Sequence, residues 1–343
     1  MKTELPSLYE NNGYYSTQRD VILQVCAKHI PGLYFTNVLG VLREFNLESQ
    51  RPRDQQWIRE VVVDEDKYFI VCCTYAQATR FLSQKFAEID LAYKMIQGKP
   101  TVFSIVGFDE RVQRTYCICL SYVTCSPSLG TERYVYSISN AVRSHLYNTL
   151  FPLIFRILGE VGGSPVKWHH IHSGAGLYAI TIDMDSTQAQ GILDVCQPYG
   201  NITLILYIGL GTYLDAVSGF EWGWEKHLEH VLIFCQVHVE RNFRKKFQQH
   251  KAFSILNQLW EAETYEEYVE RIQSLCRQYP DLRSWLRGKQ KGWIASGLVR
   301  RLSKIPGTYW GYARKNTNIA EVTHAEDNNA TGRGLTVLGA VIA

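Results

Sequence analysis

Three β-rich segments follow one another closely in residues 86–123, and this succession constrains the fold more than any other feature of the sequence. They occupy residues 86–96, 101–108 and 116–123, and short polar turns separate them. Apolar runs joined by turns of this length are typical of an antiparallel meander. The first segment carries Asp90 among apolar residues. The sequence therefore predicts a sheet whose first meander strand bears an acid.

Helices and strands alternate after the meander, which predicts an α/β fold with a mixed sheet. The expected elements are a helix, a fourth strand that ends in Asp183, a helix, a fifth strand and another helix, in residues 132–159, 176–183, 186–196, 230–235 and 239–249. The helices are expected from apolar spacing and the strands from continuous apolar runs. Residues 204–208 fit a strand or a helix equally well.

By pattern, the chain divides into four parts. Residues 1–67 are a mixed N-terminal segment of unassigned role, without zinc-finger spacing. Residues 68–251 hold the strands, and residues 252–310 are all helix-like, as an insertion would be. Residues 311–343 return to the core with a helix that carries Glu321.

Composition narrows the class of protein. Hydrophobic residues make up 46% of the 343 residues and charged residues 20%, which indicates a globular chain with a sizeable core. The net charge of +3 is too small to predict nucleic-acid binding by itself. Nine cysteines, an odd number and without framework spacing, favour reduced thiols of a cytosolic or nuclear protein. We see no signal peptide and no apolar run of membrane-spanning length.

Acidic residues on neighbouring strands predict a metal site. In a sheet of this order the first meander strand is central and the fourth strand lies beside it, so Asp90 and Asp183 should approach each other. Two unpaired carboxylates would repel, whereas bound Mg²⁺ ions relieve that repulsion. Glu321 can complete the site, and two metal ions about 4 Å apart can activate a water or a 3′-hydroxyl. Asp185 is the alternative metal ligand to Asp183 if the strand continues. Glu88, Glu326 and Asp327 are weaker candidates for ligands.

Four segments, residues 88–94, 182–191, 234–238 and 316–321, together resemble the motifs of a Mutator-like element (MULE) transposase, most closely of the fungal type. The resemblance extends over roughly residues 68–343. It implies a ribonuclease H-like DDE core: a three-strand antiparallel meander plus parallel strands, with flanking helices and an all-α insertion before the last acid.

The resemblance also implies a function and its residues. The family's acids fall on Asp90, Asp183 and Glu321, and its C-x-x-H motif on Cys235 and His238. The implied activity is metal-dependent cleavage of double-stranded DNA at transposon ends and joining to a target, in the nucleus, with Mg²⁺ or its substitute Mn²⁺. Transposases commonly act as dimers or larger assemblies, although no segment indicates a dimer interface.

Two departures from the family pattern favour an alternative. Residues 1–65 show no upstream zinc-binding recognition domain, and the chain ends within a helix that should continue. The alternative is a truncated or domesticated derivative that binds DNA or regulates without catalysis.

Smaller patterns carry weaker hypotheses. Cys235 and His238 alone cannot complete a tetrahedral zinc site, so zinc is not expected; His238 either contacts a phosphate or is structural. His169, His170 and His172 fit an exposed loop or a metal site. Residues 282–320 contain no acid, which favours DNA contact over an ordinary solvated surface. The basic residues of that stretch are Arg283, Arg287, Lys289, Lys291, Arg300, Arg301, Lys304, Arg314 and Lys315.

Overall fold

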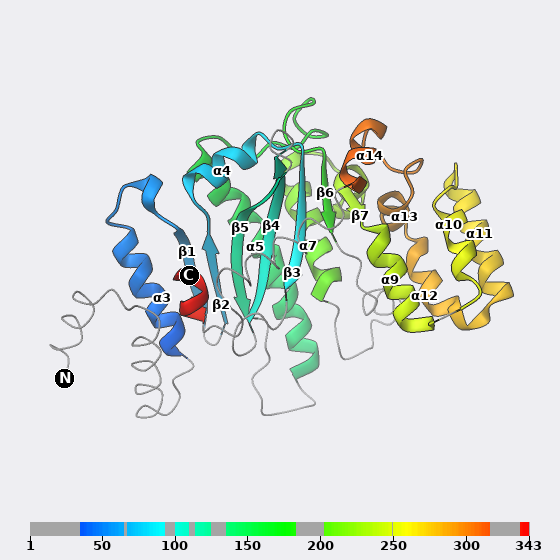
Figure 1. Cartoon of the computed structure of the whole chain (residues 1–343), viewed down its shortest axis with the longest axis horizontal. Coiled ribbons are helices and arrows are strands. Elements are labelled where there is room, and N and C mark those ends of the chain that lie inside the picture. Colours follow the sequence, from blue (N-terminus) through cyan, green and yellow to red (C-terminus); the bar gives the residue numbers. More distant parts are fainter. Residues whose placement is uncertain are drawn as a thin grey trace.

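A mixed sheet organises the chain (Figure 1). The computed structural model describes residues 35–64, 67–92, 100–109, 114–124, 135–182, 202–248, 250–315 and 337–342. In these residues seven strands form one sheet in the order β1-β2-β5-β4-β3-β6-β7. The strands are β1 (Ile58–Asp64), β2 (Lys67–Cys72), β3 (Phe86–Ala92), β4 (Pro100–Asp109), β5 (Arg114–Thr124), β6 (Ala179–Ile182) and β7 (Leu232–Phe234). The α/β class expected from the sequence is confirmed.

The predicted meander is present, and the parallel strands adjoin its first strand. β3 pairs antiparallel with β4, and β4 pairs antiparallel with β5. On its other side β3 pairs in parallel with β6, which pairs in parallel with β7. All described residues of β6 and β7 are buried, as expected for short parallel strands covered on both faces.

The sheet extends further towards the N-terminus than the sequence pattern indicates. β1 lies within residues 1–67, pairs antiparallel with β2, and so joins the sheet through the β2–β5 pairing. Its sequence, Ile-Arg-Glu-Val-Val-Val-Asp, lacks the long apolar run that made the other strands recognisable.

One face of the sheet carries the main hydrophobic core. It packs against α4 (Tyr75–Leu82), α5 (Val135–Gly162) and α7 (Ile202–Ser218). The ambiguous residues 204–208 are helical and belong to α7. Residues His230 and Val231, expected in a strand, end the preceding helix α8 (Trp224–Val231), so β7 is shorter than predicted.

The opposite face is covered at the β1 end by two helices distant in sequence. These are α3 (Phe35–Glu48) and α16 (Val337–Ile342, red in Figure 1), which lie side by side. The indole Nε1 of Trp57 donates to the carbonyl oxygen of Val341 at 2.7 Å, and the Tyr122 hydroxyl donates to that of Ala340 at 3.0 Å. The end of the described chain therefore closes a core begun by its first helix.

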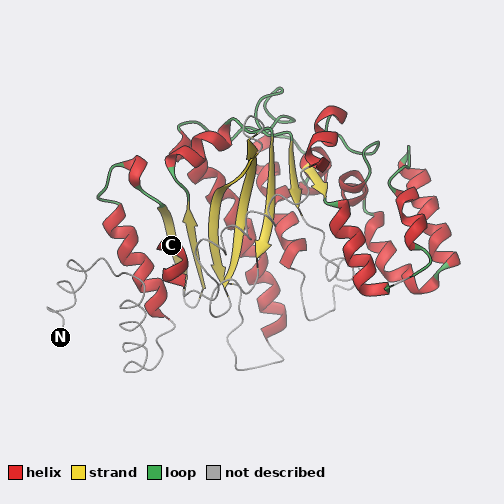
Figure 2. Cartoon of the chain, viewed as in Figure 1, coloured by secondary structure: helices red, strands yellow, loops and turns green. Residues whose placement is uncertain are grey.

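The remaining helices gather beyond the β7 end of the sheet (Figure 2). They are α9 (Gln236–Phe247), α10 (Phe253–Leu259), α11 (Tyr265–Gln278), α12 (Arg283–Arg287), α13 (Gly292–Leu298) and α14 (Gly307–Lys315), with short 3₁₀ turns at Arg53–Gln55, Pro280–Leu282 and Gly288–Gln290. Trp293 of α13 contacts Tyr207 of α7 and Phe234 of β7, with ring centroids 5.4 and 6.0 Å apart. The helical region thus shares the main core of the sheet.

No helix in the described ranges is long and apolar enough to cross a bilayer.

We expect Leu338→Ala to lower the free energy of unfolding by about 2–5 kcal/mol, because it leaves a cavity between α16 and α3. Leu338 is 2% exposed and its side chain lies against Gly40 of α3. Urea unfolding measures the effect. The matched control is Leu47→Ala on α3, where the leucine is 43% exposed and the cost should stay below about 0.5 kcal/mol. Equal costs for both variants would contradict the packing of α16.

Candidate functional site

A polar stripe crosses the face of the sheet opposite α5 and α7. It consists of Glu88 and Asp90 on β3, Ser104 on β4 and Thr181 on β6. Alternation along β3 decides the face, because Ala87 belongs to the core on the other side and successive side chains point to opposite faces. Glu88, Ser104 and Thr181 are at most 6% exposed, and Asp90 is half-buried.

Strand register brings the members of the stripe together. Asp90 is paired with Ser104 across the β3–β4 ladder, and Glu88 with Thr181 across the β3–β6 ladder. The Ser104 hydroxyl donates to the backbone carbonyl of Asp90 at 3.4 Å. The stripe is therefore a compact set of oxygen-bearing side chains.

Apolar clusters border the stripe on both sides. Towards β1 lies the cluster under α3 and α16, which includes Val102 and Tyr122. Towards β7 lies a second cluster, made of Phe86, Ala179, Ile233, Ile305 and Trp310. Because Trp310 belongs to α14, this helix covers the same face as Asp90.

Asp90 lies at the level where the two parallel strands end. Ile89, immediately before it, is paired with Ile182, the last residue of β6. Ile182 is paired in turn with Phe234, the last residue of β7. Asp90 and the N-cap residue of α9, Cys235, therefore stand at the same carboxyl edge of three parallel strands.

The other predicted ligands lie outside the described residues. This holds for Asp183, Asp185 and Glu321, and for the predicted helices at 186–196 and 317–329. Among the residues that are described, no group of three or more histidine, cysteine, aspartate or glutamate side chains is arranged to hold a metal ion. Of the three predicted acids, only the position of Asp90 is defined.

The C-x-x-H pair lies in the first turn of α9. Cys235 is 1% exposed and His238 is 7% exposed, and the Nε2 atom of His238 is 3.3 Å from Nη1 of Arg241. Gln236 donates from Nε2 to the carbonyl oxygen of Leu298 at 3.0 Å, which ties the start of α9 to α13. The N-terminus of a helix favours negative charge, so this turn is suited to an anionic group.

The basic stretch divides into exposed and buried groups. Its exposed members are Arg283, Arg287, Arg300, Arg301 and Lys304. Lys291 is half-buried, whereas Lys289 is 1% exposed and its Nζ lies 3.6 Å from the ring centroid of Trp285. The side chains of Arg314 and Lys315 lie outside those described. The tryptophans of the stretch, Trp285, Trp293 and Trp310, are each 1% exposed and pack in the core.

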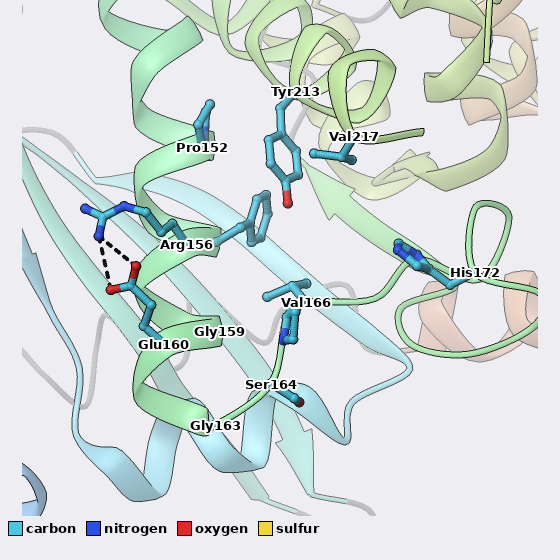
Figure 3. Close-up of a pocket in the computed structure, with 12 residues that line it drawn as sticks. Pro152, Arg156, Gly159, Glu160, Gly163, Ser164, Val166, His172, Tyr213 and Val217 are labelled. Carbon is cyan, nitrogen blue, oxygen red and sulfur yellow. Dashed lines mark hydrogen bonds and ion pairs between the residues drawn. The ribbon is translucent and has the colours of Figure 1, made fainter. Parts of the chain in front are cut away.

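A pocket of about 540 Å³ opens on the other side of the sheet, between α5, α7 and residues 163–172 (Figure 3). Its Arg156 already pairs with Glu160 at 3.0 Å and Glu60 at 3.1 Å. Because α5 and α7 cover the face opposite the stripe, this pocket is separate from Asp90.

Two features stand out more in the structure than in the sequence. Glu88, a weaker alternative ligand by sequence, shares the face of Asp90 and is buried. The histidines at 169–172 are half-buried rather than exposed, and His170 meets His227 of α8. The local run was visible in the sequence, but its partner is 57 positions away.

No family model matches the chain, and no curated protein matches it. Its function therefore has to be inferred from the polar stripe and the elements around it.

The buried Lys289 should make the stability of the protein depend on pH. Burial, with a contribution from nearby Lys246, lowers the pKa of Lys289 to about 7. An unfolded lysine titrates near pH 10.4, so between about pH 7 and 10 the unfolded chain binds more protons than the folded one. The free energy of unfolding should therefore rise with pH across this window. Below about pH 7 the full destabilisation from the buried charge of Lys289 is present.

We expect Lys289→Met to stabilise the protein at pH 7 by roughly 2–4 kcal/mol, since the buried charge is removed and only the cation–π contact is lost. The gain should shrink as the pH approaches 10. Urea unfolding at several pH values measures it, with the exposed Lys251→Met as the matched control. A gain that is independent of pH would contradict the lowered pKa.

Proposed function

We propose that this chain is the catalytic domain of a DNA transposase of the Mutator-like (MULE) type, with a ribonuclease H-like core. It would cleave phosphodiester bonds at transposon ends and transfer the strands to target DNA in the nucleus. Asp90, Asp183 and Glu321 would be its acidic triad. The single observation that carries the proposal is the position of Asp90 on β3, between the antiparallel meander and the parallel strands and level with the carboxyl end of β6.

The strand order supports the ribonuclease H-like assignment. The segment β5-β4-β3-β6-β7 has the antiparallel meander on one side of β3 and parallel strands on the other. This is the arrangement that the motif order implied. β1, β2, α3 and α16 would then be additions at the edge of that core.

Chain connectivity supports the pairing of acids. Asp183 follows Ile182 directly, and consecutive Cα atoms are about 3.8 Å apart. Since Ile182 is the register partner of Ile89, the chain leaves β6 beside Asp90. An acid at this point of the sequence is therefore well suited to share a metal ion with Asp90.

The chemistry of the stripe fits a hard cation. Its side chains offer only oxygen atoms, which Mg²⁺ and Mn²⁺ prefer over nitrogen or sulfur donors. Asp90, Asp183 and Glu321 would hold the ions, which when bound supply charge for the attacking and leaving oxygens. The first turn of α9, with His238, would face a DNA phosphate.

The exposed basic residues support a DNA partner. Arg283 and Arg287 lie on α12, and Arg300, Arg301 and Lys304 follow α13. Exposed guanidinium and ammonium groups bind backbone phosphates without reading sequence. We propose that these groups hold the element DNA, and that two ends are brought together by a homo-oligomer.

We expect Asp90→Asn to reduce nicking of supercoiled plasmid in Mg²⁺ or Mn²⁺ to the level of a reaction without metal. Asp183→Asn should behave alike, because both remove a carboxylate ligand. The thermal midpoint should be unchanged or higher, since repulsion between acids is relieved. The matched control is Asp54→Asn, an exposed aspartate distant from the stripe in the fold.

Wild-type nicking rates in a folded Asp90→Asn protein would refute the site. Absence of nicking by the folded wild type would instead favour the alternative function, a truncated or domesticated derivative that binds DNA without cutting it.

DNA binding offers an independent check. Arg283→Ala and Arg287→Ala should each weaken binding of duplex DNA, and each should reduce the slope of log K against log salt concentration by about 1, the effect of one lost phosphate contact. Fluorescence anisotropy at several salt concentrations measures the slope. The control is Arg51→Ala, because Arg51 is exposed and lies near the β1 edge of the sheet, just before β1 in the chain. Unchanged slopes for both variants would show that α12 does not contact the DNA.

A further inference from the structure

Two large aromatic side chains stand exposed in the short loop between α7 and α8. Phe220 is 37% exposed and Trp222 is 42% exposed, and their rings stack with centroids 4.6 Å apart. We call this pair the aromatic knob. Val217, in the last turn of α7, is 43% exposed. Exposed apolar side chains are ordinary when they are scattered singly, whereas several that lie together mark an interaction site.

The loop holds the aromatic knob in a fixed conformation. Gly219 and Gly223 flank it with φ angles of 68° and 76°, a region that favours glycine. The backbone N–H of Phe220 donates to the Ser218 hydroxyl at 3.0 Å, and that of Gly223 donates to Oδ1 of Asp215 at 3.0 Å. Because the loop is tied at both ends, the aromatic side chains lose little conformational freedom when they bind a partner.

The pocket of about 540 Å³ lies beside the aromatic knob (Figure 3). Val217 lines the pocket and is three residues before Phe220. His172 also lines it, and the ring of His170, two residues earlier, stacks with that of Trp222 at a centroid distance of 6.4 Å. The pocket and the aromatic knob are therefore built on the same two segments, the end of α7 and residues 170–172.

The lining of the pocket suits an aromatic side chain. Pro152, Phe155, Val166 and Tyr213 supply apolar surface, and the rings of Phe155 and Tyr213 lie 5.0 Å apart. Binding pockets of about 300–1,000 Å³ that are lined mostly by apolar and aromatic groups commonly enclose ligands of drug size. The pocket therefore has room for aromatic side chains from a partner.

The charges around the aromatic knob and the pocket do not favour a nucleic acid as that partner. Glu221 lies between the two aromatic residues of the knob and is exposed. Lys226 pairs with Glu229 at 2.7 Å, and Arg156 pairs with Glu160 at 3.0 Å. A DNA phosphate would meet carboxylates and cations that are already paired, so a protein surface is the better partner.

A surface that carries exposed aromatic side chains and a matching pocket side by side is complementary to a second copy of itself. In a two-fold dimer each contact occurs twice, because both copies use the same surface. We propose that this chain forms a two-fold dimer in which the aromatic knob of each copy enters the pocket of the other. Aromatic side chains in a partner's pocket commonly supply most of the binding energy of an interface.

This dimer leaves the polar stripe accessible. The pocket lies on the face of the sheet that α5 and α7 cover, whereas Asp90 lies on the other face. The interface supplies the homo-oligomer of the proposed transposase, and in this respect the inference rests on the proposed function. The test therefore measures dimerisation alone, without DNA or metal.

Sedimentation equilibrium of the full chain measures the dissociation constant of the dimer. We expect the wild type to be dimeric at about 10 µM, because interfaces of standard size have dissociation constants in the micromolar range or below. The double variant Phe220→Ser/Trp222→Ser removes the knob, and Val217→Arg places a charged side chain in the pocket. Each should raise the dissociation constant at least about 100-fold. The control is Tyr265→Ser, since Tyr265 is 40% exposed on the distant helix α11.

A mixture of the two variants tests whether knob and pocket meet. The knob variant keeps an intact pocket and the pocket variant keeps an intact knob, so a mixed pair regains one of the two contacts. Neither variant alone can form either contact. With a donor dye on one variant and an acceptor dye on the other, we expect energy transfer in the mixture at concentrations where each variant alone is monomeric.

Three results would overturn the proposal: a folded wild type that is monomeric at about 10 µM, variants that dimerise as tightly as the wild type, or a mixture without energy transfer. The last result is what a contact between two knobs predicts. The substituted positions are exposed, so the variants should fold, and their thermal midpoints check this. If one variant is unfolded, the dissociation constant of the other decides. DNA cleavage is not measured, so failure of this interface leaves the proposed active site to its own test.

Discussion

β3 pairs with an antiparallel strand on one side and with a parallel strand on the other, and the rest of the structure depends on this double pairing. Its antiparallel ladder with β4 fixes Asp90 opposite Ser104. Its parallel ladder with β6 places the last residue of β6, Ile182, opposite Ile89. A shift of one residue in either ladder would turn Asp90 into the apolar core, because side chains alternate between faces. The buried residues Ala87 and Ile89 prevent that shift, since they would be moved out of the core.

The same alternation explains why polar side chains are tolerated inside the sheet. Glu88, Ser104 and Thr181 are buried, and burial of polar groups is costly unless they have partners. Ser104 has such a partner, since its hydroxyl donates to the backbone carbonyl oxygen of Asp90. The concentration of these side chains in one stripe between two apolar clusters is what directs the functional proposal to this face.

Much of the fold could be predicted from the sequence because its periodic signals are local. The meander, the long helix α5 and the helices beyond β7 follow from apolar spacing and turn residues. One expectation was wrong at its boundary, because His230 and Val231 end α8 instead of opening a strand. Residues 204–208, which fit a strand or a helix, are helical. Short apolar runs fit both structures, and only packing against neighbours decides between them.

The sequence by itself determined the class of fold, the residues that alternate towards each face, and the presence of acids at strand ends. The tertiary structure decided which of these residues meet. It joined α16 to α3, paired His170 with His227, and buried Lys289 over Trp285 while leaving Arg283 exposed. Local propensity depends on residues a few positions apart, whereas such contacts depend on how whole elements pack. That packing is set by the summed burial of the core, which no short segment encodes.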